Sequence, residues 1–165
     1  MTGDIKAMFH QVLVPRSDQS SLRFLWWPRG DLNSEPREYC MTRHVFGLRA
    51  SPSCAAFALQ QTAKDHGSEF RPVTATYVQR HFYVDDFLLS VGSQEQALTA
   101  AQDVQALVAR GGFHLTKWMS SDKGVLIALD ATQRAPPVRD LDLISEALPC
   151  TKTLGISWNA EMDAF

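Results

Sequence analysis

The sequence predicts an α+β domain in which an antiparallel sheet carries helices on one face. Three observations indicate this class: runs rich in aromatic and β-branched residues, two capped helical segments, and short turns between neighbouring strands. The expected order is a strand, a hairpin, a helix, a second hairpin, a helix and two further strands. Helices that alternate with antiparallel strands are typical of α+β domains.

The composition is that of an ordinary globular domain. The chain has 165 residues, of which 45% are hydrophobic and 21% charged, so global disorder, collagen and coiled coil are excluded. A net charge of −2 argues against binding a polyanion through bulk charge. Three widely spaced cysteines indicate a reducing compartment, and no apolar run reaches the roughly 18 residues of a membrane span.

The first half of the chain contains a predicted hairpin and a predicted helix. The abrupt start in Met1–His10 indicates that a longer protein has been truncated at its N-terminus. Residues 22–27 and 37–45 favour strands, and the loop of residues 28–36 joins them. A helix is expected to begin at Ser51, with Pro52 at its first position and Gly67 just beyond its end.

The second half predicts a second hairpin and a second helix. Residues 81–91 are interpreted as two short strands around a two-residue turn. Ser93 and Gln96 have the spacing of a capping box at the start of a helix that ends at Gly111. Strands are expected at 113–118, 125–129 and 153–158, and residues 131–149 are interpreted as a linker with a short helical piece.

The residues with the clearest chemical signal are three aspartates. Asp85 and Asp86 are adjacent within an apolar, strand-forming context, where unpaired carboxylates are costly to bury. A divalent cation would offset that cost, although Asp is also common in turns. Asp4 lies at the end of a separate predicted strand, where Asp is also common and, as a helix N-cap, needs no metal. Carboxylates from separate strands that meet at one point are what two-metal phosphoryl transfer requires.

Five motifs, in order and at the right spacing, together resemble the palm of reverse transcriptases. Their details are most similar to the Pao/BEL class of LTR retrotransposon polyproteins, and the likeness covers essentially the whole chain. The motifs are Asp4-Ile5-Lys6-Ala7-Met8-Phe9, Phe46-Gly47-Leu48-Arg49-Ala50-Ser51-Pro52-Ser53, Tyr83-Val84-Asp85-Asp86, Gly112-Phe113-His114-Leu115-Thr116-Lys117-Trp118 and Leu154-Gly155-Ile156-Ser157-Trp158.

The resemblance implies a right-hand polymerase palm with part of the fingers. Residues 1–120 would form the palm, with a fingers hairpin at about 13–45. Residues 121–149 would form a connection, and residues 150–165 a primer-grip strand and the start of a thumb. The reaction implied is the templated addition of dNTPs to a primer 3′-hydroxyl with release of pyrophosphate.

The resemblance also implies roles for individual residues. Asp4 and Asp85 would be the main ligands of two Mg²⁺ ions, with Mn²⁺ as a possible substitute, and Asp86 would support them. The other implied residues are a nucleotide-binding group and a primer grip. The nucleotide-binding group is Ala7, Met8, Phe9, Phe46 and Lys117, with Phe9 excluding a ribose 2′-hydroxyl; the primer grip is Leu154, Gly155 and Ile156.

The implied partners are an RNA or DNA template with its primer, dNTPs, and the remaining parts of a polyprotein: fingers, thumb, RNase H and integrase. The expected location is intracellular, in a cytoplasmic retroelement particle with possible access to the nucleus. No membrane partner is expected. Without the remaining fingers and thumb, we do not expect this chain to polymerise on its own.

Two other interpretations stay open at the level of sequence. The chain is alternatively a catalytically inactive or domesticated retroelement fragment with at most nucleic-acid binding. More remotely, it is another two-metal palm enzyme such as a nucleotidyl cyclase. Trp26, Trp27 and six arginines between residues 16 and 49 are either contacts to a template or ordinary packing and solvated residues.

Overall fold

A computed structural model describes residues 1–164 and divides the chain into two compact units. The sheet unit consists of Met1–Lys6 together with the chain from Ala56 onward, and the hairpin unit is Ala7–Ala55. Among the described residues, no helix is both long enough and apolar enough to cross a membrane. The domain boundaries expected from the family resemblance stay a prediction.

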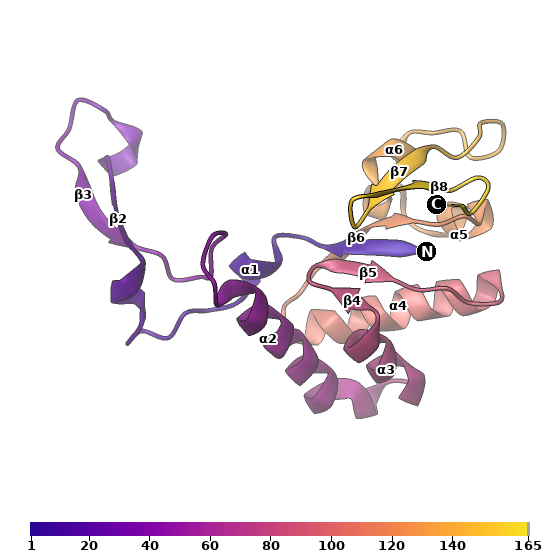
Figure 1. The fold of residues 1–165 in the computed structure, drawn as a ribbon, viewed down its shortest axis with the longest axis horizontal. Helices are drawn as coiled ribbons and strands as arrows, with labels where there is room; N and C mark the ends of the chain where they lie inside the picture. Colours follow the sequence, from indigo (N-terminus) through magenta and orange to yellow (C-terminus); the bar gives the residue numbers. More distant parts are fainter. Residues whose placement is uncertain (165) are drawn as a thin grey trace. The chain divides into compact units, whose positions relative to one another are not determined.

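The sheet unit is built on a four-stranded antiparallel sheet in the order β4-β5-β1-β6, which confirms the α+β class (Figure 1). Strand β1 is Thr2–Ile5, at the start of the chain. It pairs with β5 on one side and β6 on the other, although all three are far apart in sequence. The other strands are β4 (Phe82–Tyr83), β5 (Asp86–Leu88) and β6 (Leu115–Met119).

Two long helices begin where the sequence predicts. Helix α2 is Ser51–His66, and α4 is Gln94–Arg110 with Ser93 as its N-cap. The Ser93 hydroxyl accepts from the Gln96 backbone N–H, whereas the Gln96 side chain accepts from the N–H of Gly92 rather than that of Ser93. The second hydrogen bond of the predicted capping box therefore comes from Gly92, one residue before the N-cap.

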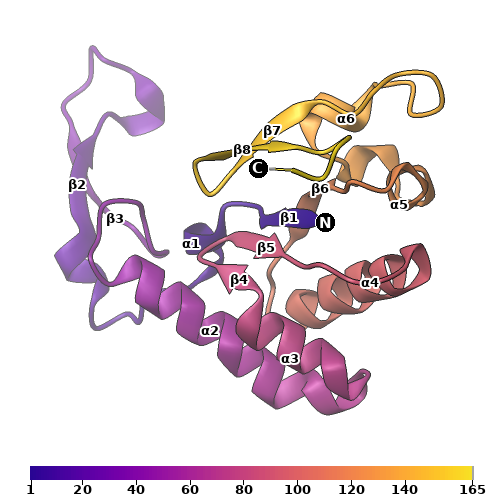
Figure 2. The same ribbon diagram turned by 45° about the vertical axis from the view of Figure 1, so that its right-hand side comes forward.

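The sequence did not predict the helix between α2 and β4. Helix α3, Pro72–Arg80, packs against α4 below the sheet in Figure 2, whereas the β7–β8 hairpin lies above the sheet. Pro72 at the first helical position was the local signal for it. Short 3₁₀ turns complete the chain at Gln19–Leu22, Pro28–Gly30, Gly67–Glu69 and Ala131–Gln133.

The core of the sheet unit lies on one face of the sheet. Phe87 and Trp118 are fully buried, and their rings meet edge to face with centroids 5.8 Å apart. Gly3 in β1 lies against this pair: a Cβ there would come within 3.2 Å of both Leu115 and Trp118. The small residue beside Asp4 therefore lets β1 approach the large ring in β6.

Two of the predicted strands are wrong. Residues 123–128 form helix α5 (Lys123–Ala128), because the Asp122 carboxylate caps it by accepting from the N–H groups of Gly124 and Val125. The single strand predicted at 153–158 is instead a hairpin of β7 (Cys150–Thr153) and β8 (Ile156–Asn159). The predicted short helical piece of the linker is α6 (Pro136–Arg139).

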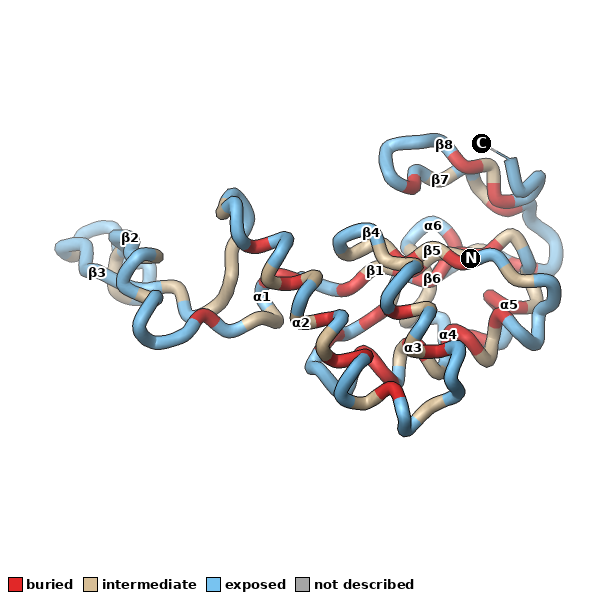
Figure 3. The backbone as a smooth tube through the Cα atoms, turned by 60° about the horizontal axis from the view of Figure 1, so that its bottom comes forward, coloured by how far each residue is buried: buried red, intermediate tan, exposed pale blue. Residues whose placement is uncertain are grey.

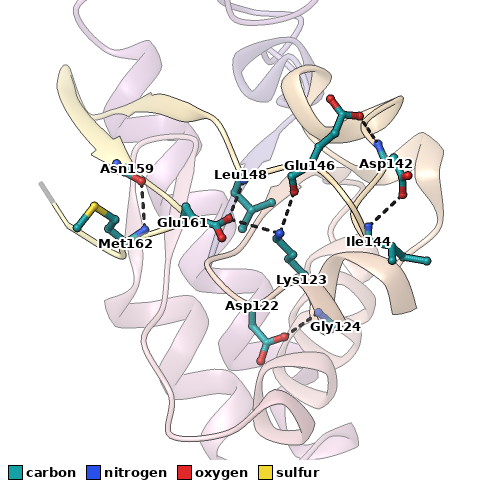
Figure 4. Close-up of polar contacts among 10 residues, drawn as sticks. All are labelled: Asp122, Lys123, Gly124, Asp142, Ile144, Glu146, Leu148, Asn159, Glu161 and Met162. Carbon is teal, nitrogen blue, oxygen red and sulfur yellow. Dashed lines mark hydrogen bonds and ion pairs between the residues drawn. The ribbon is translucent and has the colours of Figure 1, made fainter.

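A polar clamp holds the segment before β7 to the segment after β8 (Figure 4). Lys123 Nζ donates to the carbonyl of Glu146 at 2.8 Å and pairs with the Glu161 carboxylate at 3.6 Å. Glu161 also accepts from the N–H of Leu148 at 2.8 Å. Trp158 of β8 is buried in an apolar cluster with residues of β6, α5 and α6, which anchors the hairpin to the rest of the sheet unit.

The hairpin unit contains helix α1 (Met8–Gln11) and the antiparallel pair β2 (Arg23–Trp26) and β3 (Arg37–Cys40). All eight residues of β2 and β3 are exposed, in contrast to the buried residues along β1, β5 and β6 (Figure 3). The hairpin expected at about 13–45 thus contains much shorter strands, at its centre.

Candidate functional site

The structure brings the three predicted aspartates together within the sheet unit. Asp4 in β1 is the direct cross-strand partner of Asp86 in β5. The backbone N–H of Ile5 donates to the carbonyl of Asp85 at 2.9 Å, which fixes the turn against the end of β1. Residues some eighty positions apart in sequence thereby become neighbours, as the sequence hypothesis required.

Asp4 and Asp86 project from the same face of the sheet. Side chains alternate along a strand, and directly paired residues share a face. Gly3, Ile5 and Phe87 are buried on the core face, whereas Asp4 and Asp86 are half-buried on the opposite face. Like charges placed directly opposite each other repel, so this pair destabilises the sheet unless a cation lies nearby.

Asp85 lies in a tight, strained turn. Tyr83 pairs with Asp86, so the loop between β4 and β5 consists of only Val84 and Asp85. Val84 has a φ of 55°, a left-handed conformation that is costly for a β-branched residue. The sequence predicted this two-residue turn. Strained backbone conformations of this kind are commonly found at functional sites.

Lys117 supplies a cation to the site. Its Nζ lies 2.9 Å from Asp4 Oδ1, and the Asp4 side chain in this pair is 24% exposed. The register of β6 against β1 shifts between the pair Thr2–Met119 and the pair Asp4–Thr116, which leaves an extra residue in β6. Lys117, at a φ of 54°, lies in this bulge, which directs its side chain to the carboxylate face.

The charge balance of the site shows in the pKa of Asp86. Partial burial raises that pKa above its usual value, and the neighbouring carboxylates of Asp85 and Asp4 raise it further. Lys117 lowers it, but this effect is the smallest of the four. The single lysine therefore offsets only part of the negative charge, and the carboxylate face retains an attraction for a further cation.

These side chains suit a hard divalent cation by their chemistry. Carboxylate oxygens are the ligands that Mg²⁺ prefers, and it commonly takes one or two of them together with water and substrate phosphates. Within residues 1–164, however, no group of three or more His, Cys, Asp or Glu side chains is arranged so that it could hold a metal ion. In the structure the Asp4 carboxylate forms an ion pair with Lys117.

The predicted nucleotide-binding residues fall in two units. Lys117 belongs to the sheet unit, whereas Ala7, Met8, Phe9 and Phe46 belong to the hairpin unit. Ala7 has a φ of 50° and precedes α1. The rings of Phe9 and Phe46 lie 4.9 Å apart, and the Phe46 side chain is 68% exposed. The two predicted aromatic residues therefore form one cluster, although they are far apart in sequence.

The predicted primer-grip residues lie at the tip of the β7–β8 hairpin. Leu154 and Gly155 form its two-residue turn, with φ values of 52° and 79°, and Ile156 begins β8. All three are exposed. The prediction of a continuous strand was wrong here because Leu154-Gly155 adopts the left-handed conformations of a tight hairpin turn.

Sequence reasoning missed a cavity of about 620 Å³ in the sheet unit. Thr2 in β1 and its cross-strand partner Leu88 in β5 line this cavity, together with Trp158 of β8. Thr2 and Leu88 lie two residues along their strands from Asp4 and Asp86, so they share the same face of the sheet. None of the predicted site residues lines this cavity. Its walls come from several separate segments of the chain between Met1 and Asp163, so no local motif marks it.

In comparisons with known proteins, no protein-family model matches this chain, and no curated protein is significantly similar to it. The case for function therefore rests on the residues and on their arrangement in the sheet unit.

Proposed function

We propose that this chain is the palm region of an RNA-directed DNA polymerase of the Pao/BEL retrotransposon class. The single observation that carries this proposal is the cross-strand pair of Asp4 and Asp86, with Asp85 in the adjoining turn. In this arrangement, carboxylates from two non-consecutive central strands lie on one face of an antiparallel sheet. It is the arrangement that the five sequence motifs imply.

Asp4, Asp85 and Asp86 would hold the two Mg²⁺ ions of such an enzyme. Bound ions of this kind lower the pKa of a primer 3′-hydroxyl and stabilise the charge that develops on the α-phosphate. The chain's own contribution is to orient the ligands: the β1–β5 pairing fixes Asp4 and Asp86, and the bond from Ile5 N–H to the carbonyl of Asp85 fixes the turn.

The remaining proposed roles belong to substrate binding. Phe9 would exclude a ribose 2′-hydroxyl and so select dNTPs, with Phe46 packed beside it. Lys117 would exchange its contact with Asp4 for a contact with phosphate oxygens, since an ammonium group binds either anion. Leu154, Gly155 and Ile156 would contact the primer from the tip of the β7–β8 hairpin.

The alternative, an inactive retroelement fragment with at most nucleic-acid binding, is favoured by one observation. The ion pair between Lys117 and Asp4 already neutralises one of the three carboxylates. If this pair is permanent, Asp4 is not free to bind a metal ion. Metal binding therefore separates the two candidates before any assay of catalysis.

The direct test is a Mn²⁺ titration of the chain, followed by the electron paramagnetic resonance signal of free Mn²⁺. Asp4→Asn and Asp86→Asn should each weaken binding by at least about tenfold, because each removes a charged oxygen ligand. The matched control is Asp65→Asn, which changes an exposed carboxylate on α2. Equal binding by all four proteins contradicts the metal assignment.

A second test measures primer extension on a primed template with Mg²⁺ and dNTPs, using the chain joined to the fingers of an active reverse transcriptase. Asp85→Ala should abolish extension, whereas Asp65→Asn should leave it unchanged. If the Asp85→Ala protein extends primers at the parent's rate, Asp85 is not a metal ligand.

A further inference from the structure

The β7–β8 hairpin forms one wall of the cavity in the sheet unit. Thr153 in β7, Trp158 in β8 and Asp163 in the turn after β8 line the cavity from this side. The other walls come from β1 and β5 and from helices α4 and α5. Thr153 and Trp158 are 9% and 3% exposed and Ala97 on α4 is 6% exposed, so little of these walls faces bulk solvent. The hairpin therefore covers the cavity.

Side-chain contacts attach this hairpin to the rest of the sheet unit. β7 and β8 form a two-stranded sheet of their own, separate from the four-stranded sheet. The hairpin can therefore move away from the four-stranded sheet without breaking a hydrogen bond of that sheet. An isolated two-stranded hairpin is at best marginally stable in water, so its backbone amides lose protection once the hairpin is released.

The first of these contacts is made by the body of the hairpin. Trp158 packs into the apolar cluster beside Met119 of β6 and Leu126 of α5. Its indole N–H donates to the Asp163 carboxylate at 3.0 Å, so the turn after β8 is tied to β8 itself. The two strands and this turn thus form one body that rests on a single large side chain.

The second contact is made at the base of the hairpin, where both of its ends meet Lys123 (Figure 4). Lys123 Nζ donates to the Glu146 carbonyl before β7 and pairs with the Glu161 carboxylate after β8. Glu161 also accepts from the N–H of Leu148, which joins the two ends to each other. The side chains of Lys123 and Glu161 are 31% and 44% exposed, and partly exposed ion pairs of this kind are weak enough to open.

We propose that residues 148–164 form a hinged lid over the cavity, and that Lys123 holds the base of this lid in its closed position. In the open state Trp158 would leave the apolar cluster, and the cavity walls on β1, β5 and α4 would become accessible to small molecules. The lid would open without metal, nucleotide or nucleic acid. The inference therefore stands beside the proposed function and does not rest on it.

Hydrogen exchange measured by mass spectrometry tests the opening of the lid. Lys123→Met should speed exchange of the β7 and β8 amides by about three- to tenfold, because it removes one charged contact that is partly exposed. Exchange in β1 and β5 should stay unchanged. The matched control is Lys152→Met, which removes an exposed lysine from β7 itself. Equal exchange of the hairpin in the two variants overturns the role of Lys123.

A second variant breaks the clamp without changing α5. Glu161→Gln removes the charge that faces Lys123 but keeps an oxygen that can accept from the N–H of Leu148. It should also speed exchange in β7 and β8, and combining it with Lys123→Met should add less than the sum of the two effects, since both remove the same contact. Fully additive effects would show that the two residues do not act through one clamp.

Thiol labelling tests whether the hairpin controls access to the cavity. Ala97→Cys places a thiol on the cavity wall formed by α4, and Ala100→Cys, the control, places one at a buried position of the same helix outside the cavity lining. Peptide mass spectrometry separates both from the native cysteines. Adding Lys123→Met should speed labelling of the Ala97→Cys thiol by about three- to tenfold and leave the Ala100→Cys thiol unchanged.

Two results of this labelling would overturn the proposal. Equal acceleration at both positions would mean that the whole sheet unit unfolds, rather than the hairpin alone. Unchanged labelling of the Ala97→Cys thiol, in a protein whose β7 and β8 amides exchange faster, would mean that the hairpin moves without opening the cavity.

Discussion

The two hairpins of this chain that flank helix α2 differ in what supports them. β4–β5 belongs to a four-stranded sheet, and Phe87 on its inner face is fully buried against Trp118. β2–β3 forms a two-stranded sheet of its own, with both faces exposed. Both hairpins contain aromatic and charged residues, so composition alone does not distinguish them.

The difference determines how firmly each hairpin can hold a side chain in place. Side chains that must be positioned to within about half an ångström require rigid neighbours, and the β4–β5 hairpin has such a neighbour in β1. The β2–β3 hairpin has none in its sheet, because β2 and β3 pair only with each other. Four comparisons between paired variants follow, in order of the size of the expected effect.

The largest expected effect compares two phenylalanines. Phe87→Ala should lower the free energy of unfolding by about 3–5 kcal/mol, because it leaves a cavity in the core of the sheet unit. Phe24→Ala, on the exposed hairpin, should lower it by less than about 1 kcal/mol. Urea unfolding followed by circular dichroism measures both, and similar losses would show that the two hairpins are equally supported.

The next effect compares two ion pairs. Lys117→Met should lower stability by about 1 kcal/mol at pH 7, because Asp4 and Asp86 then repel each other without a cation. Arg23→Met removes a pair whose side chains are both more than half exposed and should change stability by less than about 0.5 kcal/mol.

The same lysine variant sharpens the metal proposal. If Lys117 and a divalent cation compete for Asp4, Lys117→Met should also raise the affinity for Mn²⁺ several-fold. A variant that loses stability but binds Mn²⁺ no better would indicate that the ion pair is purely structural.

The features of the fold and site that sequence predicted are those with local causes. Ser51 with Pro52 and Ser93 with Gln96 mark helix starts through contacts within one turn, and both helices begin there. The two-residue turn at Val84 and Asp85 is likewise local. The position of this turn beside Asp4 was predicted only from the motifs and their chemistry, because no local signal determines that β1 pairs with β5.

The features that sequence did not predict depend on register or on a choice between two local preferences. Lys117 reaches Asp4 only because β6 is bulged against β1, and a shift of one residue would turn its side chain to the other face. The apolar run after Gly124 suits a strand or a helix equally, and the Asp122 cap decides for α5. Gly155 was a sign of the β7–β8 turn that the strand prediction passed over.

A third test concerns the turns themselves, since each hairpin loop holds a non-glycine residue at positive φ. Val84→Gly should raise stability by about 0.5–1 kcal/mol, because glycine relieves the left-handed strain of a β-branched residue. Arg29→Gly in the β2–β3 loop should change global stability less, because unfolding of that loop is not coupled to a buried core. Thermal unfolding measures the change in stability of both proteins. A larger gain for Arg29→Gly than for Val84→Gly would show that the β2–β3 loop contributes more to global stability than the β4–β5 turn.

The smallest expected effect depends on pH and tests the repulsion within the carboxylate face. The pKa of Asp86 is raised in the folded chain, so its contribution to stability is full below the usual carboxyl pKa and is lost as the pH rises through the raised value. Asp86→Asn should therefore stabilise the protein at pH 7, by less than about 1 kcal/mol because the group is partly solvated, and the gain should vanish near pH 3.

Glu69, on the far side of the sheet unit, gives the control of opposite sign. Its pKa is lowered, first by the hydrogen bond with His66 and further by Arg110, so its contribution is present above the usual carboxyl pKa and lost as the pH falls through the lowered value. Glu69→Gln should destabilise the protein at pH 7 and have no effect at low pH. Stability curves from pH 3 to pH 7 for the two variants should therefore diverge from the parent in opposite directions. Curves that diverge in the same direction would show that Asp86 is stabilised by its surroundings, in which case its carboxylate would have no unmet attraction for a cation.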